Sequence, residues 1–576
     1  MSIGRVIRFL IALVITAVFG WVIDYFAMPA WTFESTGFWW FCIIELAILA
    51  VFCHIGDRIA DDVYDAPIFT LISAGGAIVM LLACFFTGIG GWEMTSADEY
   101  QKIAQIEDGV FEEDVLEASS DDLVVVDVRT AIKIGNRKLG EVKNSTWYEV
   151  NNEFNLITIK GEKYRISPLD YGGISKFFKA KEVGIPGYIL INALDQENSE
   201  YVILDEPMKY SPSACLEYDL TRHIHKQFPS YMLAKHFFEV DDEGKPYWIT
   251  GVYDATIGNR GGLVIKSVII TDAVSGKMEE VKLEDLPEWV DHALSVNYLM
   301  RLAEWHYTYV HGFGNSIFAK TDVFNTSYKY RGSNNDESDA NTPFDGYNSV
   351  TTKDGSIWFY TGITPANNSE SNTGFLLISP RTGEMRYYKS SGAEESSAQI
   401  EAEALISEKK YSASFPTIVN VNGEETYFMT LKDAAGLVQR YAFCSVENYT
   451  KCVCADTIEE ALYLYQVKMG FIEGNESIFE DDGDTDVTNK PEEDLSEREY
   501  KTVKGKVTLV EKAEIDGYTY YYFMIEGEMT IFMSSIENSN MQPIKLVENS
   551  EVKITYYDSK ENGIGIVTQI YFESGM

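Results

Sequence analysis

Histidine, cysteine and basic residues are scarce in this sequence. Its 576 residues include 7 His and 7 Cys, and 47 Lys and Arg stand against 88 Asp and Glu, for a formal net charge of -41. Because a field this negative repels phosphate backbones, we exclude nucleic acid as a partner. The charge is compatible with cations or basic peptides as ligands, and also with simple solubility, which is the more ordinary explanation.

Cysteine is too sparse to build a disulfide framework. Three of the seven cysteines, Cys42, Cys53 and Cys84, lie in hydrophobic stretches, which leaves four for the rest of the chain. Cys452 and Cys454 would share one face of a strand, but they have neither the usual zinc spacing nor a second ligand pair. The sequence therefore favours buried, apolar roles for these cysteines.

The common catalytic and metal-binding motifs are also missing. There is no G-x-S-x-G, H-E-x-x-H or G-x-x-x-x-G-K-[ST] motif, and no dinucleotide fingerprint opens a helix. His223, His225 and His236 form the only histidine cluster, and an i,i+2 pair diverges on the helix expected there. The acids of residues 482–486 resemble the start of a calcium loop, but Val487 occupies the position that requires Gly. No catalytic residue can be assigned, and we predict no cofactor and no tightly bound metal.

What the sequence does have is three long hydrophobic runs near its start. Residues 6–28, 37–55 and 67–92 are each long enough to cross about 30 Å of hydrocarbon at 1.5 Å per residue. We therefore predict a transmembrane anchor of three helices over residues 1–92.

The basic residues that flank these runs predict their orientation. Arg5, Arg8 and Arg58 lie on one side of the predicted membrane and Lys102 on the other. Since basic residues are retained in the cytoplasm, we expect a multi-pass protein of the cell membrane with its large C-terminal part extracellular. Alternatively, the first run is a cleaved signal peptide, although no small-x-small site follows it; the remainder would still be outside.

Glu45 stands in the middle of the second hydrophobic run. A carboxyl group is costly at that depth, so it is a candidate for function by default. We expect Glu45 to face the helix bundle, hydrogen-bonded to Ser73 or Thr70 on the third helix. Ion or proton handling is the alternative.

Charged and β-type segments follow the hydrophobic runs. Residues 93–121 are acidic and partly helical in pattern, which predicts a stalk. Strand-like runs at Leu123–Val126, Leu156–Lys160 and Tyr188–Ala193 predict a β-rich domain over residues 122–210.

An internal repeat is the most informative feature of the chain. Glu243–Val252, Asp354–Ile363 and Asn422–Leu431 each begin with an acid or amide and a Gly, then continue with two adjacent aromatics and end near a Thr. This pattern is typical of a hairpin turn that leads into a strand. The predicted turn glycines are Gly244, Gly355 and Gly423.

A second strand and turn follow in the first two copies. Asp272–Met278 and Ser379–Met385 match, with Asp272, Gly276 and Gly383 as their turn residues, whereas the third copy lacks this turn. Helical patterns alternate with the strands, at residues 214–227, 286–310, 393–409 and 457–469. We predict an α+β array of three helix-plus-antiparallel-sheet modules, at 211–300, 301–390 and 391–473.

The turn at Asp272–Met278, with its Asp-Ala-x-Ser-Gly-Lys-Met pattern, resembles the end of a PepSY-type module. The three-helix start and stretches such as Val126–Gly140, Ile185–Gly187 and Met208–Ser213 resemble uncharacterised membrane proteins of Firmicutes, a likeness that covers residues 1–470. The PepSY resemblance implies an extracytoplasmic module that binds or restrains peptidases. The second resemblance implies no activity.

The C-terminal region begins with an acidic linker at residues 474–499. Residues 500–576 then contain five strand-like runs, which predict a small OB-like β-barrel. Its acidic balance, 7 Lys against 11 Asp and Glu, argues against the nucleic-acid binding known for that fold.

These observations predict a membrane-anchored extracytoplasmic binding or scaffolding protein of the bacterial cell envelope, with a protein or peptide partner. Two alternatives stay open. One is an envelope hydrolase whose catalytic carboxylates come from different modules. The other is a transport or sensing component that uses the hydrophobic helices. The sequence does not reveal the partner or the oligomeric state.

Overall fold

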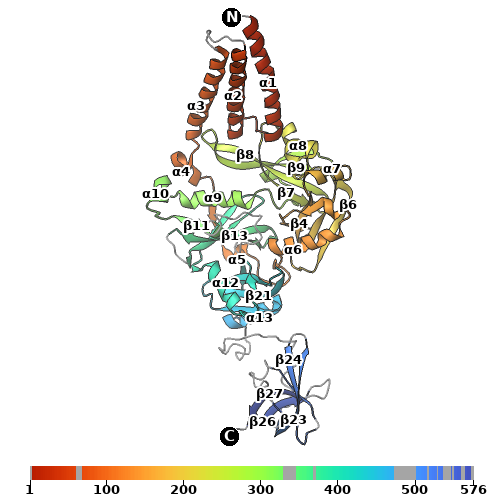
Figure 1. The fold of residues 1–576 in the computed structure, drawn as a ribbon. Helices are drawn as coiled ribbons and strands as arrows, with labels where there is room; N and C mark the ends of the chain where they lie inside the picture. The colour runs from red at the N-terminus through yellow and green to blue at the C-terminus, as the bar shows by residue number, and fades with distance from the viewer. Residues whose placement is uncertain are drawn as a thin grey trace. The chain divides into compact units, whose positions relative to one another are not determined.

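The computed structural model of the protein has two compact units, Met1–Val487 and Thr488–Met576 (Figure 1). The residues it describes are 3–59, 68–328, 346–366, 371–472, 501–515, 518–528, 530–535, 547, 550–558 and 565–572. The predicted acidic linker, 474–499, lies outside the described residues. The prediction of a mixed α+β protein with many antiparallel sheets is confirmed.

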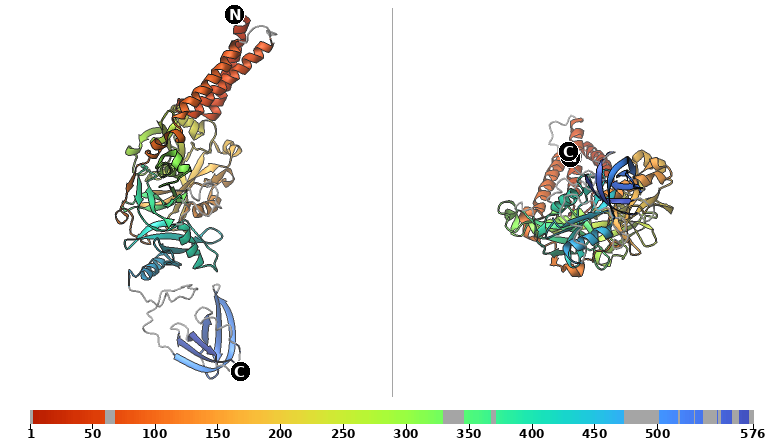
Figure 2. Two further views of the ribbon diagram at one scale, coloured as in Figure 1. Left: turned by 90° about the vertical axis from the view of Figure 1, so that its left-hand side faces the viewer. Right: turned by 90° about the horizontal axis from the view of Figure 1, so that it is seen from below.

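Three apolar helices open the chain: α1 Ile3–Ala27, α2 Thr36–Ile59 and α3 Ile68–Ile89. All three are long and apolar enough to cross a membrane, and α2 packs against both α1 and α3 (Figure 2). Their large apolar side chains point outward, as in Trp21, which is 68% exposed, and Phe86, which is 66% exposed. A helix that exposes such a surface belongs in lipid rather than water, so these helices suggest a membrane association.

The segment after α3 is not the separate stalk that the sequence predicts. It contains α4 Glu93–Gln101, β1 Ile106–Asp108 and α5 Phe111–Asp114. Strand β1 joins a sheet more than 270 residues away, where it pairs in parallel with β16 Met385–Tyr388. The polar composition of the segment after α3 therefore reflects a position on the surface of the modules. The segment is not an isolated spacer.

Four helix-plus-sheet modules follow, and we name them A (residues 123–208), B (209–282), C (291–388) and D (390–469). Module A contains α6 Val128–Lys138, β2 Tyr148–Val150, β3 Asn155–Ile159, β4 Glu162–Tyr171, α7 Ile174–Ala180, β5 Ile185–Asn192 and β6 Ser199–Met208. Module B contains η3 Leu216–Tyr218, α8 Leu220–Gln227, β7 Met232–Val240, β8 Pro246–Ile257, β9 Gly261–Asp272 and β10 Met278–Lys282.

Modules C and D likewise begin with a helix that is followed by the strands of an antiparallel sheet. Module C contains α9 Val296–Thr308, α10 Gly312–Ile317, β11 Phe324–Thr326, β12 Asn348–Thr351, β13 Ile357–Pro365, β15 Gly374–Ile378 and β16. Module D contains α12 Glu395–Ala404, β18 Ser412–Ala413, β19 Thr417–Val421, β20 Glu424–Lys432, β21 Val438–Ser445, β22 Cys452–Ala455 and α13 Ile458–Met469. A two-stranded ribbon, β14 Ser371–Asn372 with β17 Gly392–Ala393, links C to D.

One backbone arrangement recurs in all four modules. In each module, one backbone carbonyl in the turn before the last strand accepts hydrogen bonds from backbone N–H groups. These N–H groups lie in the segment that precedes the module's helix. The pairs are Val125 and Val126 to Ala193, Lys209 and Tyr210 to Ala273, Ala293 and Leu294 to Pro380, and Ala393 to Val446. Modules B and C share a sequence pattern at this turn, whereas modules A and D lack it, so in A and D the hydrogen bonds identify the repeat where the residues do not.

The internal repeat is thus confirmed, with two corrections. The predicted β-rich domain, 122–210, is itself a copy: Gly161, at φ +87°, precedes β4 as the other turn glycines precede their strands. Arg165 replaces the second aromatic there, which hid this copy. Module D also has this turn, although its sequence lacks the turn pattern. There the N–H of Ser445 donates to the carbonyl of Lys451.

One predicted helix is too long at its start. The pattern at 286–310 predicts helix throughout, but α9 begins at Val296, capped by Ser295. Ala293 and Leu294 are held in the recurring turn contact with Pro380, so they are not available for helical hydrogen bonds.

The modules contact one another in a closed cycle, A to B to C to D and back to A. The contacts in that order are Tyr188 Oη to the Gly244 carbonyl at 3.1 Å, Ile249 with Phe359 in one apolar core, Thr417 Oγ1 to the Ser349 carbonyl at 2.9 Å, and Thr130 Oγ1 to the Gly436 carbonyl at 3.1 Å. Each module therefore buries its apolar face against neighbours on two sides.

Module B also docks against the apolar helices. The turn between β8 and β9 lies so close to the end of α3 that a Cβ on Gly261 would lie 2.3 Å from the carbonyl oxygen of Gly91. Arg260 in that turn donates to the Sγ of Cys84 at 2.9 Å, and its guanidinium lies 5.4 Å from the ring centre of Trp39. The glycines at the end of α3 permit this approach.

Cys444 and Cys452 form a disulfide between β21 and β22. The interpretation of Cys452 as a simple buried apolar side chain is wrong. The strand register places the two cysteines directly opposite each other, a relationship that sequence spacing does not reveal. Cys454 is free.

The described residues of the C-terminal unit form five strands: β23 Lys501–Ile515, β24 Tyr518–Ile525, β25 Phe532–Ser535, β26 Glu551–Asp558 and β27 Gly565–Phe572. They close in the order β23, β24, β25, β27, β26, with β25 and β27 parallel. Phe523, Phe532, Val552, Ile554 and Val567 are fully buried inside.

Candidate functional site

Glu45 faces α1 and not α3. A Cβ on Gly20 of α1 would lie 2.8 Å from Oε2 of Glu45, and Oε1 of Glu45 has no hydrogen-bond partner among the described residues. Thr70, one of the two expected partners, donates instead to Asp57 at 3.3 Å. The predicted hydrogen bond to Thr70 is wrong because the carboxyl lies in the seam between α1 and α2. Ion or proton handling, the alternative role for Glu45, stays a prediction.

The predicted turn glycines lie in turns of three different modules. Gly244, Gly355, Gly423, Gly276 and Gly383 all have φ between +73° and +84°, a conformation that L side chains rarely adopt. These turns shape the hairpins and do not come together in one site.

Asp272 stabilises its own turn. Its carboxylate accepts the N–H groups of Val274 and Ser275, both at 2.9 Å, and pairs with Lys245 at 2.7 Å. Burial works to raise the pKa of Asp272, but Lys245 and the turn N–H groups outweigh it and hold the pKa below its usual range. The arrangement is structural, since Oδ1 accepts the turn N–H groups and Oδ2 pairs with Lys245.

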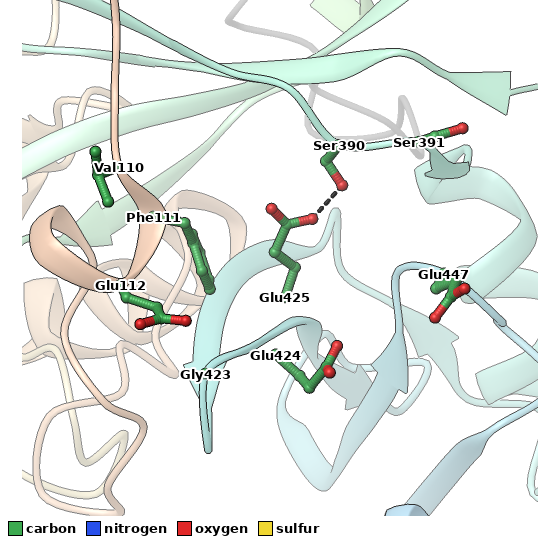
Figure 3. A pocket seen from close by; sticks show the side chains of 9 residues that line it. All are labelled: Val110, Phe111, Glu112, Ser390, Ser391, Gly423, Glu424, Glu425 and Glu447. Carbon is green, nitrogen blue, oxygen red and sulfur yellow. Dashed lines mark hydrogen bonds between the residues drawn. The ribbon is translucent and has the colours of Figure 1, made fainter.

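An acidic pocket of about 550 Å³ lies between the α5 segment and module D (Figure 3). Its lining residues are Val110, Phe111, Glu112, Ser390, Ser391, Gly423, Glu424, Glu425 and Glu447. Four of the nine are glutamates and none is basic. The pocket thus offers concentrated negative charge beside one aromatic ring, the combination that favours a cationic group.

The four glutamates differ in their surroundings. Glu112, Glu424 and Glu447 are exposed, whereas Glu425 is half-buried and accepts a hydrogen bond from the Ser390 hydroxyl. Burial raises the pKa of Glu425 and the neighbouring Glu424 adds to this, although the Ser390 hydroxyl lowers it. A cation in the pocket would relieve the repulsion between these carboxylates.

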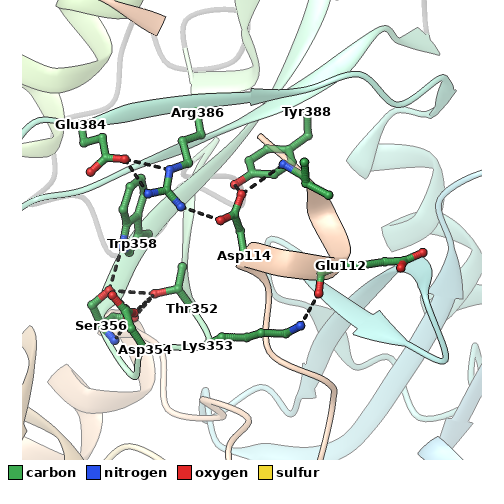
Figure 4. A network of polar contacts seen from close by, with 11 residues as sticks. Glu112, Asp114, Thr352, Lys353, Asp354, Ser356, Trp358, Glu384, Arg386 and Tyr388 are labelled. Atoms are coloured by element: carbon green, nitrogen blue, oxygen red, sulfur yellow. Dashed lines mark hydrogen bonds and ion pairs between the residues drawn. The ribbon is translucent and has the colours of Figure 1, made fainter. Parts of the chain in front are cut away.

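A polar network fixes the α5 wall of the pocket to module C (Figure 4). Asp114 pairs with Arg386 at 2.6 Å and accepts from the Tyr388 hydroxyl at 2.7 Å. Lys353 donates to the carbonyl of Glu112, and the Arg386 guanidinium lies 4.9 Å from the ring centre of Trp358. This short helix is therefore held in place although it has only four residues.

A second cluster of ionisable groups is buried where modules A, B and C meet. Glu239 accepts the N–H groups of Asp291, at 2.9 Å, and His292, while Asp291 accepts the N–H of Thr158 at 2.6 Å. Burial raises the pKa of Glu239 to about 8 and that of Asp291 to about 7, and it lowers the pKa of His292 to about 4. Glu239 and His292 are buried and Asp291 is partly buried, so this cluster joins modules.

The histidines that the sequence singles out have structural partners. His236 bonds to the Thr221 and Thr250 hydroxyls at 2.9 and 2.8 Å, and His223 bonds to the Gly276 carbonyl at 2.8 Å. Within the part of the chain that the structure describes, no three His, Cys, Asp or Glu residues are placed to hold a metal ion.

Sequence reasoning missed the pocket because its walls are far apart in the chain. Glu112 lies more than 300 residues before Glu424. One local signal was present: Glu424 and Glu425 directly follow Gly423, the turn glycine of the third predicted repeat, so two acids were already known to begin a strand at a hairpin.

Comparison with known proteins does not assign this chain to a family. No family model matches the chain, and no curated protein matches it significantly.

Proposed function

We propose that this chain is a multi-pass membrane protein whose four modules lie outside the cell and bind a protein or peptide partner through a cationic group. The acidic pocket carries this proposal, because a cavity of about 550 Å³ with four glutamates, a phenylalanine and no basic lining residue favours such a group. Its volume lies in the range of ordinary ligand sites. The fixed α5 wall means that the pocket exists before the partner arrives, which lowers the entropic cost of binding.

Two further observations support the external location. The residues around the apolar helices place Arg5, Arg8 and Arg58 on one side and Lys102 on the other, as a cytoplasmic N-terminus requires. Cys444 and Cys452 form a disulfide, and such bonds persist in oxidising compartments outside the cytoplasm.

The PepSY-type resemblance favours a peptidase, or the peptide that it cleaves, as the class of partner. Support comes from the turn at Asp272, which closes β9 and begins β10. We also propose that the C-terminal unit is OB-like, because its strand order, with β25 parallel to β27 in a closed barrel, suits that fold. Its acidic charge argues against a nucleic-acid role there.

The test is binding of a fluorescent hexapeptide rich in Lys and Arg to the full chain in nanodiscs. The variant E112Q/E424Q/E447Q removes three exposed pocket charges, each worth about 0.5 kcal/mol, so affinity should fall about tenfold. The control D205N/E206Q/E279Q removes three exposed acids far from the pocket residues in sequence, and its affinity should change less than about twofold. Equal losses in both variants would show nonspecific attraction and would reject the pocket as the site.

An envelope hydrolase is the second candidate, and the pocket is also what favours it. Acids from separate elements line one cavity, and Glu425 has a raised pKa, as a general acid requires. The substitution Glu425→Gln separates the two functions. It should abolish turnover of any cell-wall glycan or peptide that the chain cleaves, whereas a binding protein would release no product before or after the substitution.

A further inference from the structure

A basic, apolar helix face stands out on the surface of module A. Helix α7 has Ile174 and Phe178 one turn apart, and their side chains are 69% and 50% exposed. The same short segment, residues 174–183, contains three lysines, Lys176, Lys179 and Lys181, and one acid, Glu182. In a chain with a net charge of -41, this is a local reversal of sign.

The inward face of the same helix explains why the outward residues stay exposed. Phe177 and Ala180 are buried, at 1% and 0% exposure, and they anchor α7 to the core of module A. Ile174 and Phe178, four residues apart, share a different face, about 100° around the helix axis from the buried one, and Lys181 lies one turn further along it. Because the helix is fixed by its inner side, Ile174 and Phe178 cannot turn inward to escape water.

Helix α7 begins near the segment that contacts the apolar helices. Tyr171, three residues before α7, donates its N–H to the Ser213 hydroxyl at 3.1 Å. That loop leads through η3 to α8, where Arg222 donates to the carbonyl of Tyr25 in α1 at 3.0 Å and lies 4.0 Å from the Tyr25 ring centre. Figure 1 shows α7 and α8 in the layer of the modules nearest α1.

We infer that α7 rests on the bilayer that holds α1 to α3, an inference that depends on the membrane anchoring proposed above. Ile174 and Phe178 enter the headgroup boundary, and Lys176, Lys179 and Lys181 meet the phosphates of anionic lipids. Apolar side chains on one face with lysines beside them are what an interfacial helix uses, and the membrane affinity then depends on anionic lipid. Exposed Leu216 in η3, between α7 and the Tyr25 contact, extends the same surface.

This contact would fix the tilt of the modules above the membrane. The docking of Arg260 under α3 and of Arg222 under α1 already ties module B to the helices. A third contact through α7 lies in module A, so the array would rest on lipid as well as on its own anchor.

The experiment places an environment-sensitive fluorescent amino acid at position 178 of the full chain in nanodiscs. Spin labels on lipid headgroups should quench it at least twofold more than the same probe at Ile400, a 67% exposed position on α12 of module D. The variant K176Q/K179Q/K181Q should lose that quenching in anionic nanodiscs. Equal quenching at positions 178 and 400 would overturn the inference. So would quenching at position 178 that is unchanged in the K176Q/K179Q/K181Q variant.

A probe at Trp21 of α1 separates this inference from the proposed anchoring. Spin labels in the acyl chains should quench that probe whatever α7 does. Quenching at 21 without quenching at 178 would overturn the α7 contact alone. No quenching at 21 would overturn the anchoring and the α7 contact together.

Discussion

Asp127 and Lys432 form an ion pair that joins the first module to the last. Asp127 also caps α6 by accepting the N–H of Thr130 at 2.9 Å. The pair lies more than 300 residues apart in the chain, and it closes the cycle of four modules.

The substitution Lys432→Met should lower the free energy of unfolding by about 2 to 3 kcal/mol, because it leaves a largely buried carboxylate without its partner. Loss of hydrogen-exchange protection should be greatest in α6 and β20. Lys138→Met is the matched control, since Lys138 pairs with Glu141 on an exposed surface and should cost at most about 0.5 kcal/mol. Equal effects of the two substitutions would contradict the closure of the cycle through Lys432.

The same pair predicts a loss of stability in acid. Burial opposes ionisation of Asp127, but Lys432 and the Thr130 N–H outweigh it and lower the pKa to about 2 from 3.8. A depressed carboxyl pKa stabilises the fold above the unfolded value, so about 2 kcal/mol should be lost as the pH falls from about 4 to about 2. Thermal unfolding across this range should show a smaller pH dependence in Lys432→Met.

Glu239 predicts the opposite pH dependence near neutrality. Burial raises its pKa to about 8 from 4.5, so the folded protein binds the proton more tightly than the unfolded chain and stability should fall as the pH rises from about 4.5 to 8. Glu239→Gln removes this titration but loses one backbone hydrogen bond, worth about 1 kcal/mol. The variant should be less stable than the parent at pH 5 and more stable at pH 8.5. Parallel stability curves for the two proteins would contradict a buried, titrating Glu239.

The docking of module B on α3 is tested at Gly261. A valine there would place its Cβ 2.3 Å from the Gly91 carbonyl oxygen and 2.6 Å from the Tyr100 hydroxyl, so the turn must move away. Cys84, which Arg260 now contacts, should then react faster with a maleimide in peptide-resolved mass spectrometry. Gly140→Val, at a glycine with open space around it, should leave the reactivity of Cys84 unchanged. Unchanged reactivity in Gly261→Val would reject the close approach.

Much of the local structure follows from sequence pattern. Hydropathy alone locates α1, α2 and α3, because a run of apolar residues needs no tertiary information to be recognised. The Gly and aromatic pattern likewise locates β8, β13 and β20 with their turns, since positive φ restricts the residues that a hairpin accepts.

Long-range features did not follow. Module A escaped detection because Arg165, with Nε bonded to the Val126 carbonyl at 2.9 Å, fills a place that aromatics fill elsewhere. The sequence pattern predicts no role for Gly88, Gly90 and Gly91. Their role is seen only in the fold, where the β8–β9 turn lies against them. The acidic pocket depends on β1 joining β16, which brings Glu112 to module D, and no local pattern encodes such a pairing.

The disulfide offers an independent prediction about compartment. In protein purified from cells with thiols blocked at lysis, Cys444 and Cys452 should be unavailable to alkylation until a reductant is added. Replacing both by Ala should lower stability by about 2 kcal/mol, the value expected for so short a loop. Alkylation of both residues without reductant would show a reducing location.

Whether the four modules lie outside the cell is tested most directly by adding protease to intact cells. The acidic segment at residues 474–499 precedes the strands of the C-terminal unit and is rich in the polar residues that proteases reach. An external location predicts that protease removes the C-terminal unit from intact cells while a cytoplasmic marker stays whole. Cleavage in this segment only after lysis would place the modules in the cytoplasm and contradict the proposed function.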